Sequence, residues 1–222
     1  MDFETEEQQL EAIKNWWKQN AVIIIGGIAL GIAAIFGNQY YQQQKAAHAD
    51  MASMLYEQVL MGVQNPAVID ETLTRVNTLV GEFKDTPYAS LAALVIARHH
   101  LNAGEFDKAQ LRYQWVITNA AQDELKYLSK IRLARLMLGN KQADQALVIL
   151  SETYPESFTG MVLELKGDVY LSQGENDQAK AAYTQAKLLS SSANRWLQLK
   201  IDDIGETTVS TKPTTGNTEP SA

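Results

Sequence analysis

The feature that most constrains the fold of this chain is an uninterrupted apolar stretch near its N-terminus. Residues 21–37 read AVIIIGGIALGIAAIFG, and none of these seventeen side chains is charged or strongly polar. As an α-helix the stretch would be about 26 Å long, at the short end of what crosses a hydrocarbon core of about 30 Å. A soluble helix would need a polar face. We therefore expect residues 21–41 to form a single transmembrane helix rather than a buried core helix.

Aromatic residues flank this stretch on both sides. Trp16 and Trp17 precede it, and Tyr40 and Tyr41 follow it. Amphipathic rings at these places are typical of the two interfaces of a membrane. Residues 1–20 carry apolar side chains at helical spacing among acidic ones, which predicts an amphipathic segment at the membrane surface.

The lysines near the span indicate its orientation. Lys14 and Lys18 precede the span, and Lys45 is the only Lys or Arg between the span and Arg75. Basic residues favour the cytoplasmic side of a membrane. This small excess predicts a single-pass type II protein of the bacterial inner membrane, with residues 1–20 in the cytoplasm and the C-terminal domain in the periplasm.

A cleaved secretory signal is the alternative interpretation of the N-terminus. Ala47-His48-Ala49 has the A-x-A form of a cleavage site. Against cleavage, the apolar run exceeds a usual signal core of about 7–15 residues, a polar segment separates it from the site, and the leading residues are mostly acidic. Cleavage would instead produce a secreted soluble protein, so that alternative stays open to experiment.

Two glycines in the span form a G-x-x-x-G pattern, Gly27 and Gly31. Without Cβ atoms, two helices can approach closely along such a face. The pattern predicts packing of Gly27 and Gly31 against a partner helix in the membrane, although the ordinary small-residue content of membrane helices produces the same spacing.

Composition favours helix between residues 45 and 205. Gly and Pro are scarce there, whereas Ala, Leu, Gln and Lys are common, and the latter are good helix formers. The chain has no cysteine, so disulfides and thiolate metal sites are excluded. Its net charge is −7 with no basic cluster after the span, which argues against nucleic acid as a partner, since that partner requires concentrated Lys and Arg.

Internal similarity recurs about every 35 residues after Pro87, in the range of helix-turn-helix repeats. The tetratricopeptide pattern has a small residue in the first helix, a second small residue twelve positions later, and an aromatic residue four further on. The residues that match it are Ala97, Ala109, Tyr113, Ala134, Ala146, Gly167, Ala179 and Tyr183. Leu150 replaces the aromatic residue in the middle unit. The turn segments NAGEFDKA and SQGENDQA also resemble each other.

These patterns together predict an all-α fold, with an N-terminal single transmembrane helix followed by an α-solenoid of tetratricopeptide-like helix pairs at residues 42–204. The helix that leaves the membrane should end near residue 64, because Asn65-Pro66 breaks it, and a second should span 67–83. The expected pairs are 88–102 with 106–120, 124–138 with 142–153, and 158–173 with 176–189. A helix at 193–201, with Leu197 and Ile201 packed inward, should cap the open end. The Thr-rich residues 205–222 should form a disordered tail.

The sequence contains no pattern typical of a catalytic, cofactor or metal site. His99 and His100 are adjacent, so on a helix they point about 100° apart and do not chelate one ion together. Glycine-rich phosphate loops and the H-E-x-x-H motif are absent. We expect a protein that is not an enzyme and that has no cofactor, no metal and no small-molecule substrate.

Stacked helix pairs leave a concave surface lined by the first helix of each pair, and such surfaces bind protein segments. The polar residues that repeat position assigns to this surface are Arg98, Asn102, Arg132, Arg135 and Glu164. Each could equally be an ordinary solvated side chain.

The combination of these features is more specific than its parts. The run E-Q-x-x-E-A-I-K-N-W-W-K-Q-N at residues 7–20, one apolar span and three helical repeats resemble the YfgM-like family, the ancillary subunits of the SecYEG translocon. The resemblance covers residues 1 to about 204. Its strongest points are Glu11, Lys14, Trp16, Trp17, and the segments 131–135 and 141–147. The Thr-rich tail is not a feature of that resemblance.

The resemblance implies an inner-membrane protein with a periplasmic repeat domain. Its implied partners are the SecYEG translocon and a membrane-anchored periplasmic chaperone of the peptidyl-prolyl isomerase-like kind, and its implied role is to help pass exported chains to periplasmic chaperones. It also implies restraint of a stress-response regulator through the cytoplasmic segment. The residues alone leave a second function open, a membrane-anchored scaffold or regulator in another envelope assembly, for cell division or stress-response signalling.

Overall fold

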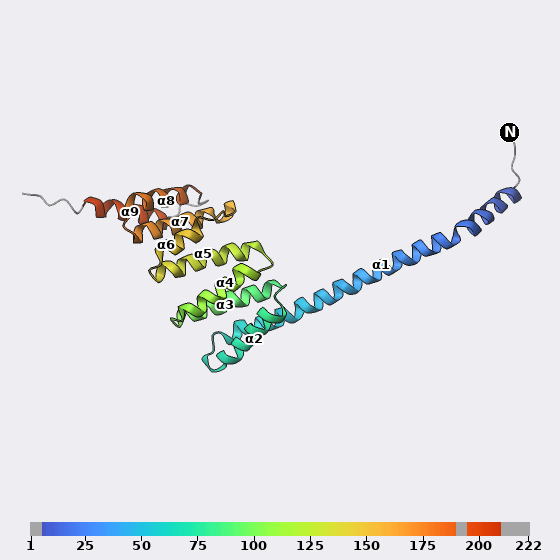
Figure 1. Ribbon diagram of the computed structural model, residues 1–222, viewed down its shortest axis with the longest axis horizontal. Coiled ribbons are helices and arrows are strands. Elements are labelled where there is room, and N and C mark those ends of the chain that lie inside the picture. The colour runs from blue at the N-terminus through green and yellow to red at the C-terminus, as the bar shows by residue number, and fades with distance from the viewer. Residues whose placement is uncertain (1–5, 190–194, 210–222) are drawn as a thin grey trace, which may run out of the picture. The chain divides into compact units, whose positions relative to one another are not determined.

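The computed structural model describes residues 6–189 and 195–209, and the regular secondary structure of these residues is helical, without a strand (Figure 1). The expected all-α fold is confirmed. The chain divides into two units, residues 1–51 and residues 52–222. The elements in chain order are α1 (Glu6–Gly62), the short 3-10 helix η1 (Pro66–Val68), α2 (Ile69–Glu82), α3 (Pro87–Asn102), α4 (Phe106–Asn119), α5 (Asp123–Gly139), α6 (Ala143–Leu150), α7 (Glu156–Ser172), α8 (Asn176–Leu189) and α9 (Arg195–Val209).

The described part of the first unit is a single stretch of α1 whose apolar side chains are exposed. Val22 is 81% exposed and Leu30 is 74% exposed. Among the described residues, α1 is the one helix long and apolar enough to cross a membrane, and none of its most apolar window is buried. In water such a surface would be a large uncovered apolar patch, whereas a bilayer would cover it.

The candidate membrane-interface and packing residues lie on this exposed helix. Trp16, Trp17, Tyr40 and Tyr41 are all exposed. A Cβ atom added at Gly27 or at Gly31 would meet no other atom within 4 Å. The glycine face of α1 is therefore open to a partner helix.

The second unit is a stack of helix pairs in which consecutive helices from α2 to α9 contact each other, and α5 also contacts α7. Helix α3 shows how the layers connect. Its Ala89 and Ile96 belong to a core shared with α2, whereas Ala93 and Ala97 belong to a core shared with α4 and α5. Because α3 is buried on both sides, the helices before it and after it stack on one another, as in a solenoid.

The residues singled out by the repeat pattern lie inside this stack. All eight are buried, and the set is Ala97, Ala109, Tyr113, Ala134, Ala146, Gly167, Ala179 and Tyr183. Leu150, which replaces the aromatic residue of the middle unit, is also completely buried.

The end of α1 and helix α2 form a further pair that the repeat pattern did not identify. Val59 of α1 and Val76 of α2 are completely buried in one core. The helices lie close together at Gly62, where a Cβ atom would lie 2.1 Å from Thr72 Oγ1. Because Gly62 has no side chain, Thr72 fits against the last turn of α1.

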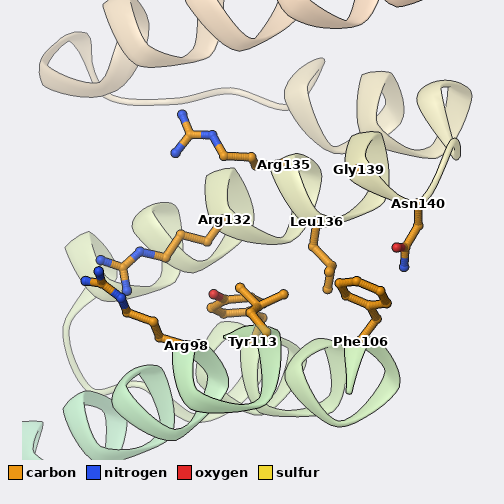
Figure 2. Close-up of a pocket in the computed structure, with 9 residues that line it drawn as sticks. Arg98, Phe106, Tyr113, Arg132, Arg135, Leu136, Gly139 and Asn140 are labelled. Carbon is orange, nitrogen blue, oxygen red and sulfur yellow. The ribbon is translucent and has the colours of Figure 1, made fainter. Parts of the chain in front are cut away.

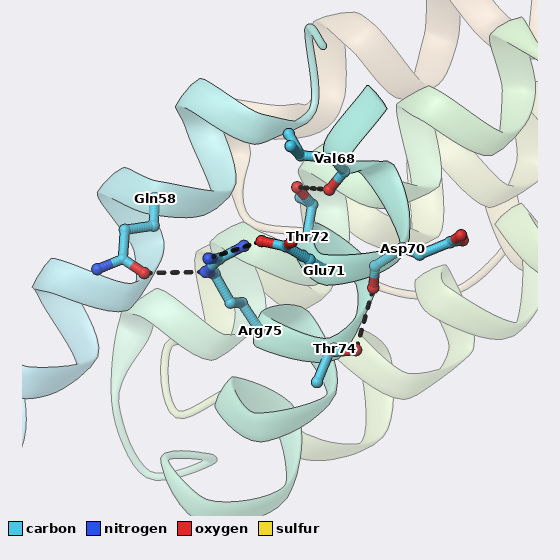
Figure 3. Close-up of polar contacts among 7 residues, drawn as sticks. All are labelled: Gln58, Val68, Asp70, Glu71, Thr72, Thr74 and Arg75. Atoms are coloured by element: carbon cyan, nitrogen blue, oxygen red, sulfur yellow. Dashed lines mark hydrogen bonds and ion pairs between the residues drawn. The ribbon is translucent and has the colours of Figure 1, made fainter. Parts of the chain in front are cut away.

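Polar contacts hold this additional pair together at its surface (Figure 3). Arg75 of α2 donates to Gln58 Oε1 of α1 at 2.9 Å and pairs with Glu71 at 3.3 Å. Between the two helices, the side chain of Asn65 accepts a hydrogen bond from the backbone N–H of Ala67 at 3.1 Å, which caps η1.

Two expected boundaries are wrong. Helix α6 ends at Leu150 rather than at 153. The Tyr154 hydroxyl donates to the Ile149 carbonyl at 3.1 Å, a carbonyl that a longer helix would use for its own backbone. Helix α9 extends to Val209, so residues 205–209 are helical rather than part of a disordered tail. Once a helix has formed, each added residue gains one backbone hydrogen bond. The start of the expected cap at 193–194 and the tail at 210–222 lie outside the described residues.

The turns within the three pairs that follow α2 share one geometry. The turn residue has a positive φ in each, 75° at Gly104, 61° at Lys141 and 78° at Gly174. The next backbone N–H donates to a carbonyl five residues back at 2.8–2.9 Å, from Glu105 to His100, from Gln142 to Met137 and from Glu175 to Tyr170. This is a helix-ending motif that favours glycine, so Lys141 keeps the repeat geometry without the glycine that normally supports it.

In the last pair, α7 lies close to α8 at Gly167. A Cβ atom there would lie 2.4 Å from Cε1 of the completely buried Tyr183. The Tyr183 hydroxyl donates to Asp168 at 2.7 Å. Lys200 of α9 donates to the same carboxylate at 2.6 Å, so the capping helix is fixed to this crossing.

We expect Gly167→Ala to lower the free energy of unfolding by roughly 1–3 kcal/mol, because the new methyl group would overlap a buried ring. The matched control is Gly160→Ala in the same helix, where a Cβ atom would have its nearest neighbour at 4.0 Å. That control should gain up to about 1 kcal/mol of helix propensity. Denaturant unfolding of the full chain in detergent, followed by circular dichroism, measures both. Equal stabilities of the two variants would contradict the close crossing.

Candidate protein-binding site

A cavity of about 420 Å³ lies where α3, α4 and α5 meet (Figure 2). This volume is typical of pockets that bind ligands. The cavity is lined by Arg98, Leu101, Phe106, Tyr113, Arg132, Arg135, Leu136, Gly139 and Asn140. We call it the arginine pocket, because three of the chain's six arginines line it.

Repeat geometry explains why these arginines come together. Arg98 follows the buried Ala97 on α3, and Arg132 and Arg135 flank the buried Ala134 on α5. Positions three apart on a helix are neighbours, and Arg132 and Arg135 both line the pocket. In Figure 2 the Arg132 side chain extends toward Arg98, whereas the Arg135 side chain projects away from them. The sequence had assigned all three to one concave surface, and the structure places all three at one cavity.

The three guanidinium groups have no counter-charge in the described protein. None of the pocket residues is acidic, and none of the three arginines makes a hydrogen bond or ion pair to a described residue. Their positive charge affects the pKa of Tyr113. Burial raises the pKa of the Tyr113 phenol, and the charges of the three arginines partly offset that increase.

The two ends of the arginine pocket differ in chemistry. In Figure 2, Arg98 and Arg132 extend toward one end, whereas Phe106 and Leu136 face each other toward the other end. Phe106 is 44% exposed, although it is an apolar residue at the start of a helix. The pocket therefore offers a basic half next to an apolar half.

A second cavity, between α2, α3 and α4, provides the contrast. It measures about 510 Å³ and is lined by Leu73, Asn77, His100, Lys108, Leu111, Arg112 and Trp115. Here the polar groups have partners, since Arg112 donates to Asn77 at 3.0 Å and Lys108 pairs with Glu105 at 2.8 Å. Of these two cavities, the arginine pocket is the one whose charged lining residues have no partner among the described residues.

Known proteins that resemble this chain identify its family. The family model described as tetratricopeptide repeat-like domain matches residues 14–206. A protein of Aggregatibacter actinomycetemcomitans named ancillary SecYEG translocon subunit is 31% identical, over 82% of this chain and 88% of its own length. The protein of the same name from Escherichia coli is 27% identical over 91% of this chain and 98% of its own length. The chain belongs to the tetratricopeptide repeat-like family of ancillary SecYEG translocon subunits. No solved structure matches it.

Family membership confirms two expectations from the sequence, the resemblance to ancillary SecYEG translocon subunits and the α-solenoid of tetratricopeptide-like pairs. The family name is not that of an enzyme. Among the residues that the structure describes, no three His, Asp or Glu side chains are grouped so as to hold a metal ion. One apolar N-terminal helix in a translocon-related family fits a single-pass inner-membrane protein.

The other two surface candidates from the sequence do not join the arginine pocket. Asn102 lines a separate cavity of about 340 Å³, of which Arg98 is also a lining residue. Glu164 of α7 pairs with Lys200 of α9 at 3.0 Å, so an internal cation already satisfies it.

The apolar half of the arginine pocket was not predicted from the sequence. Leu101, Phe106 and Leu136 occupy positions that in a repeat are usually assigned to packing. The available indication was Phe106, a large apolar residue directly after a tight turn, where an exposed side chain is common.

His100 is the one buried histidine of the chain, and it lies beside the carboxylate of Glu105. Its Nδ1 lies 2.6 Å from Glu105 Oε2, and its side chain is 5% exposed. Burial lowers the pKa of His100; Glu105 opposes this, whereas the positive charges of Lys108 and Arg112 add to it. Near neutral pH the imidazole is therefore uncharged and donates its Nδ1 hydrogen to Glu105.

We expect the free energy of unfolding to fall as the pH drops below about 6.5, because the unfolded chain then protonates His100 while the folded protein resists that proton. His100→Gln, which keeps a donor to Glu105, should lose this part of the pH dependence, and His99→Gln should keep it. Denaturant unfolding at pH values on both sides of 6.5 measures the effect. A His100→Gln protein with the full wild-type pH dependence would show that His100 is not its source.

Proposed function

We propose that this chain is a subunit associated with the SecYEG translocon, and that its repeat domain helps pass exported chains to periplasmic chaperones. The proposed arrangement has residues 1–20 in the cytoplasm, residues 21–41 in the inner membrane and residues 42–204 in the periplasm. A membrane-anchored peptidyl-prolyl isomerase-like chaperone is the second proposed partner.

The observation that carries this proposal is that one chain has both an exposed apolar helix and an open pocket whose arginines have no described partner. The names of the relatives point to the translocon as the assembly, and the arginine pocket supplies a surface for protein segments. Tethering such a surface beside an export pore would raise its effective concentration for emerging chains without any new contact. No catalytic chemistry is needed for this role.

The orientation of the anchor is supported by the excess of lysine before the span, Lys14 and Lys18 against Lys45. Because the chain has no cysteine, each introduced cysteine is a unique label. A membrane-impermeant maleimide added to intact spheroplasts should label Gln145→Cys at once but Gln9→Cys only after lysis, since both positions are exposed. The reverse pattern would overturn the orientation. Release of the protein by carbonate would overturn the anchor and favour cleavage after Ala49.

The partners are tested by crosslinking in intact membranes, solubilisation in mild detergent and mass spectrometry of the purified complex. We expect translocon subunits and a membrane-anchored chaperone in stoichiometric yield. If Gly27 and Gly31 pack on a partner, Gly27→Leu/Gly31→Leu should reduce that yield severalfold, because the added side chains separate the helices.

The matched control enlarges the opposite face of the same helix, with Ala29→Leu/Ala33→Leu. These alanines lie about 200° around the helix from the glycines, so this control should leave the yield unchanged. Equal yields from both variants would remove the glycine face from the proposal. Recovery of a cell-division or stress-signalling assembly without the translocon would replace the proposed function by the alternative scaffold.

A further inference from the structure

We infer that the arginine pocket binds an extended acidic segment of a partner protein, in which carboxylate side chains are followed by an apolar residue. This inference deepens the proposed function, since it rests on the repeat domain binding proteins. It does not depend on which assembly the anchor joins. The occupant is defined by the charge and shape of the pocket.

The first step is the unpaired charge. Of the three arginines outside the pocket, Arg75 and Arg112 each have a polar partner within the protein, whereas the exposed Arg195 has none among the described residues. Inside the pocket, Arg98, Arg132 and Arg135 have none among the described residues. Guanidinium groups bind carboxylates through paired, charge-assisted hydrogen bonds, so a partner with several carboxylates completes what the chain leaves open.

The second step is the apolar half of the pocket. Phe106, which is 44% exposed, lies beyond Arg98 and Arg132 along the same cavity, beside the buried Leu136. Covering Phe106 removes apolar surface from water. Single exposed ion pairs contribute little to a binding free energy. An occupant that satisfies the arginines and also covers the half-exposed Phe106 therefore binds better than one that makes either contact alone.

The third step concerns the size of the anion. An extended polyanion such as nucleic acid or an anionic bilayer covers more of the surface than the pocket, so it also approaches the carboxylates that give the chain its net charge of −7. A short peptide with a few carboxylates responds mainly to the nearby guanidinium groups, because salt screens charges beyond about 8–10 Å. The pocket therefore favours an acidic peptide over an extended polyanion.

The test uses the full chain in nanodiscs of zwitterionic lipid and fluorescein-labelled peptides with blocked ends. The probe peptide has a block of glutamates followed by two leucines, and the comparison peptides replace the glutamates by glutamines or the leucines by serines. Fluorescence anisotropy should show that the probe binds at least tenfold more tightly than the glutamine peptide, and that its binding weakens as salt is added.

The variants separate the pocket from charge in general. Arg98→Gln/Arg135→Gln, at two exposed positions, should weaken binding of the probe at least tenfold. Arg195→Gln removes an exposed arginine of α9 outside the pocket and should leave binding unchanged. Phe106→Ser should weaken binding of the probe severalfold but should hardly affect the serine peptide. Thermal unfolding by circular dichroism verifies that each variant is folded, and a folded Arg132→Gln protein provides a second pocket variant.

Three outcomes would overturn the inference. The first is equal binding of the glutamate and glutamine peptides, and the second is an equal loss of probe affinity in the pocket variant and in Arg195→Gln. The third is displacement of the labelled probe by phosphatidylglycerol vesicles or an oligonucleotide at charge concentrations where unlabelled probe does not displace it. The crosslinking experiment separates this failure from that of the proposed function. Recovery of the translocon without binding of the probe would contradict the acidic-segment inference alone. Binding of the probe without recovery of the translocon would contradict the proposed function alone.

Discussion

The repeat domain depends on close crossing of antiparallel helices, which small residues make possible. At Gly167 and at Gly62 the neighbouring side chain occupies the space that a Cβ atom would need. Ala97, Ala109 and Ala134 are completely buried for the same reason. Close crossings keep the layers thin, so that one helix such as α3 contributes to two cores at once. The surface arginines can then face a shared cavity because their helices are only one layer apart.

Sequence spacing predicts this arrangement where small and aromatic residues recur at fixed intervals, as at Ala97, Ala109 and Tyr113. It fails where the same contact is made by other residues. The pair formed by α1 and α2 relies on Gly62 against Thr72, a contact with no periodic counterpart. The pocket was only half predicted, because charge at Arg98, Arg132 and Arg135 is evident from polarity. Whether Phe106 or Leu136 packs inside or lines a cavity depends on how three helices meet, which no local pattern encodes.

The charged side chains on the first helices of successive pairs differ in whether they have a partner within the chain. On α7, Glu164 and Asp168 are negative, and Lys200 of the capping helix α9 forms ion pairs with both, at 3.0 and 2.6 Å. On α3 and α5 the charges are positive, and no described residue of the chain neutralises them. The cap thus closes one charged surface with an internal partner and leaves the other available. Burial and the Asp168 hydrogen bond both raise the pKa of Tyr183. The Tyr183 phenol therefore keeps its proton and continues to donate it to Asp168.

Three like charges without a described partner make the arginine pocket locally positive, and the repulsion between such exposed groups is weak because water and salt screen it. The protein could relieve that repulsion with a single glutamate among the pocket residues, as it does beside Lys108, where Glu105 accepts from the lysine at 2.8 Å. Its acidic composition offers many carboxylates, 26 against 19 basic residues, yet none lines this pocket. Such a cluster is stabilised when an external anion binds. An anionic occupant relieves this repulsion and gains the corresponding free energy on binding, whereas a neutral occupant does not. The repulsion therefore contributes to selectivity for anions.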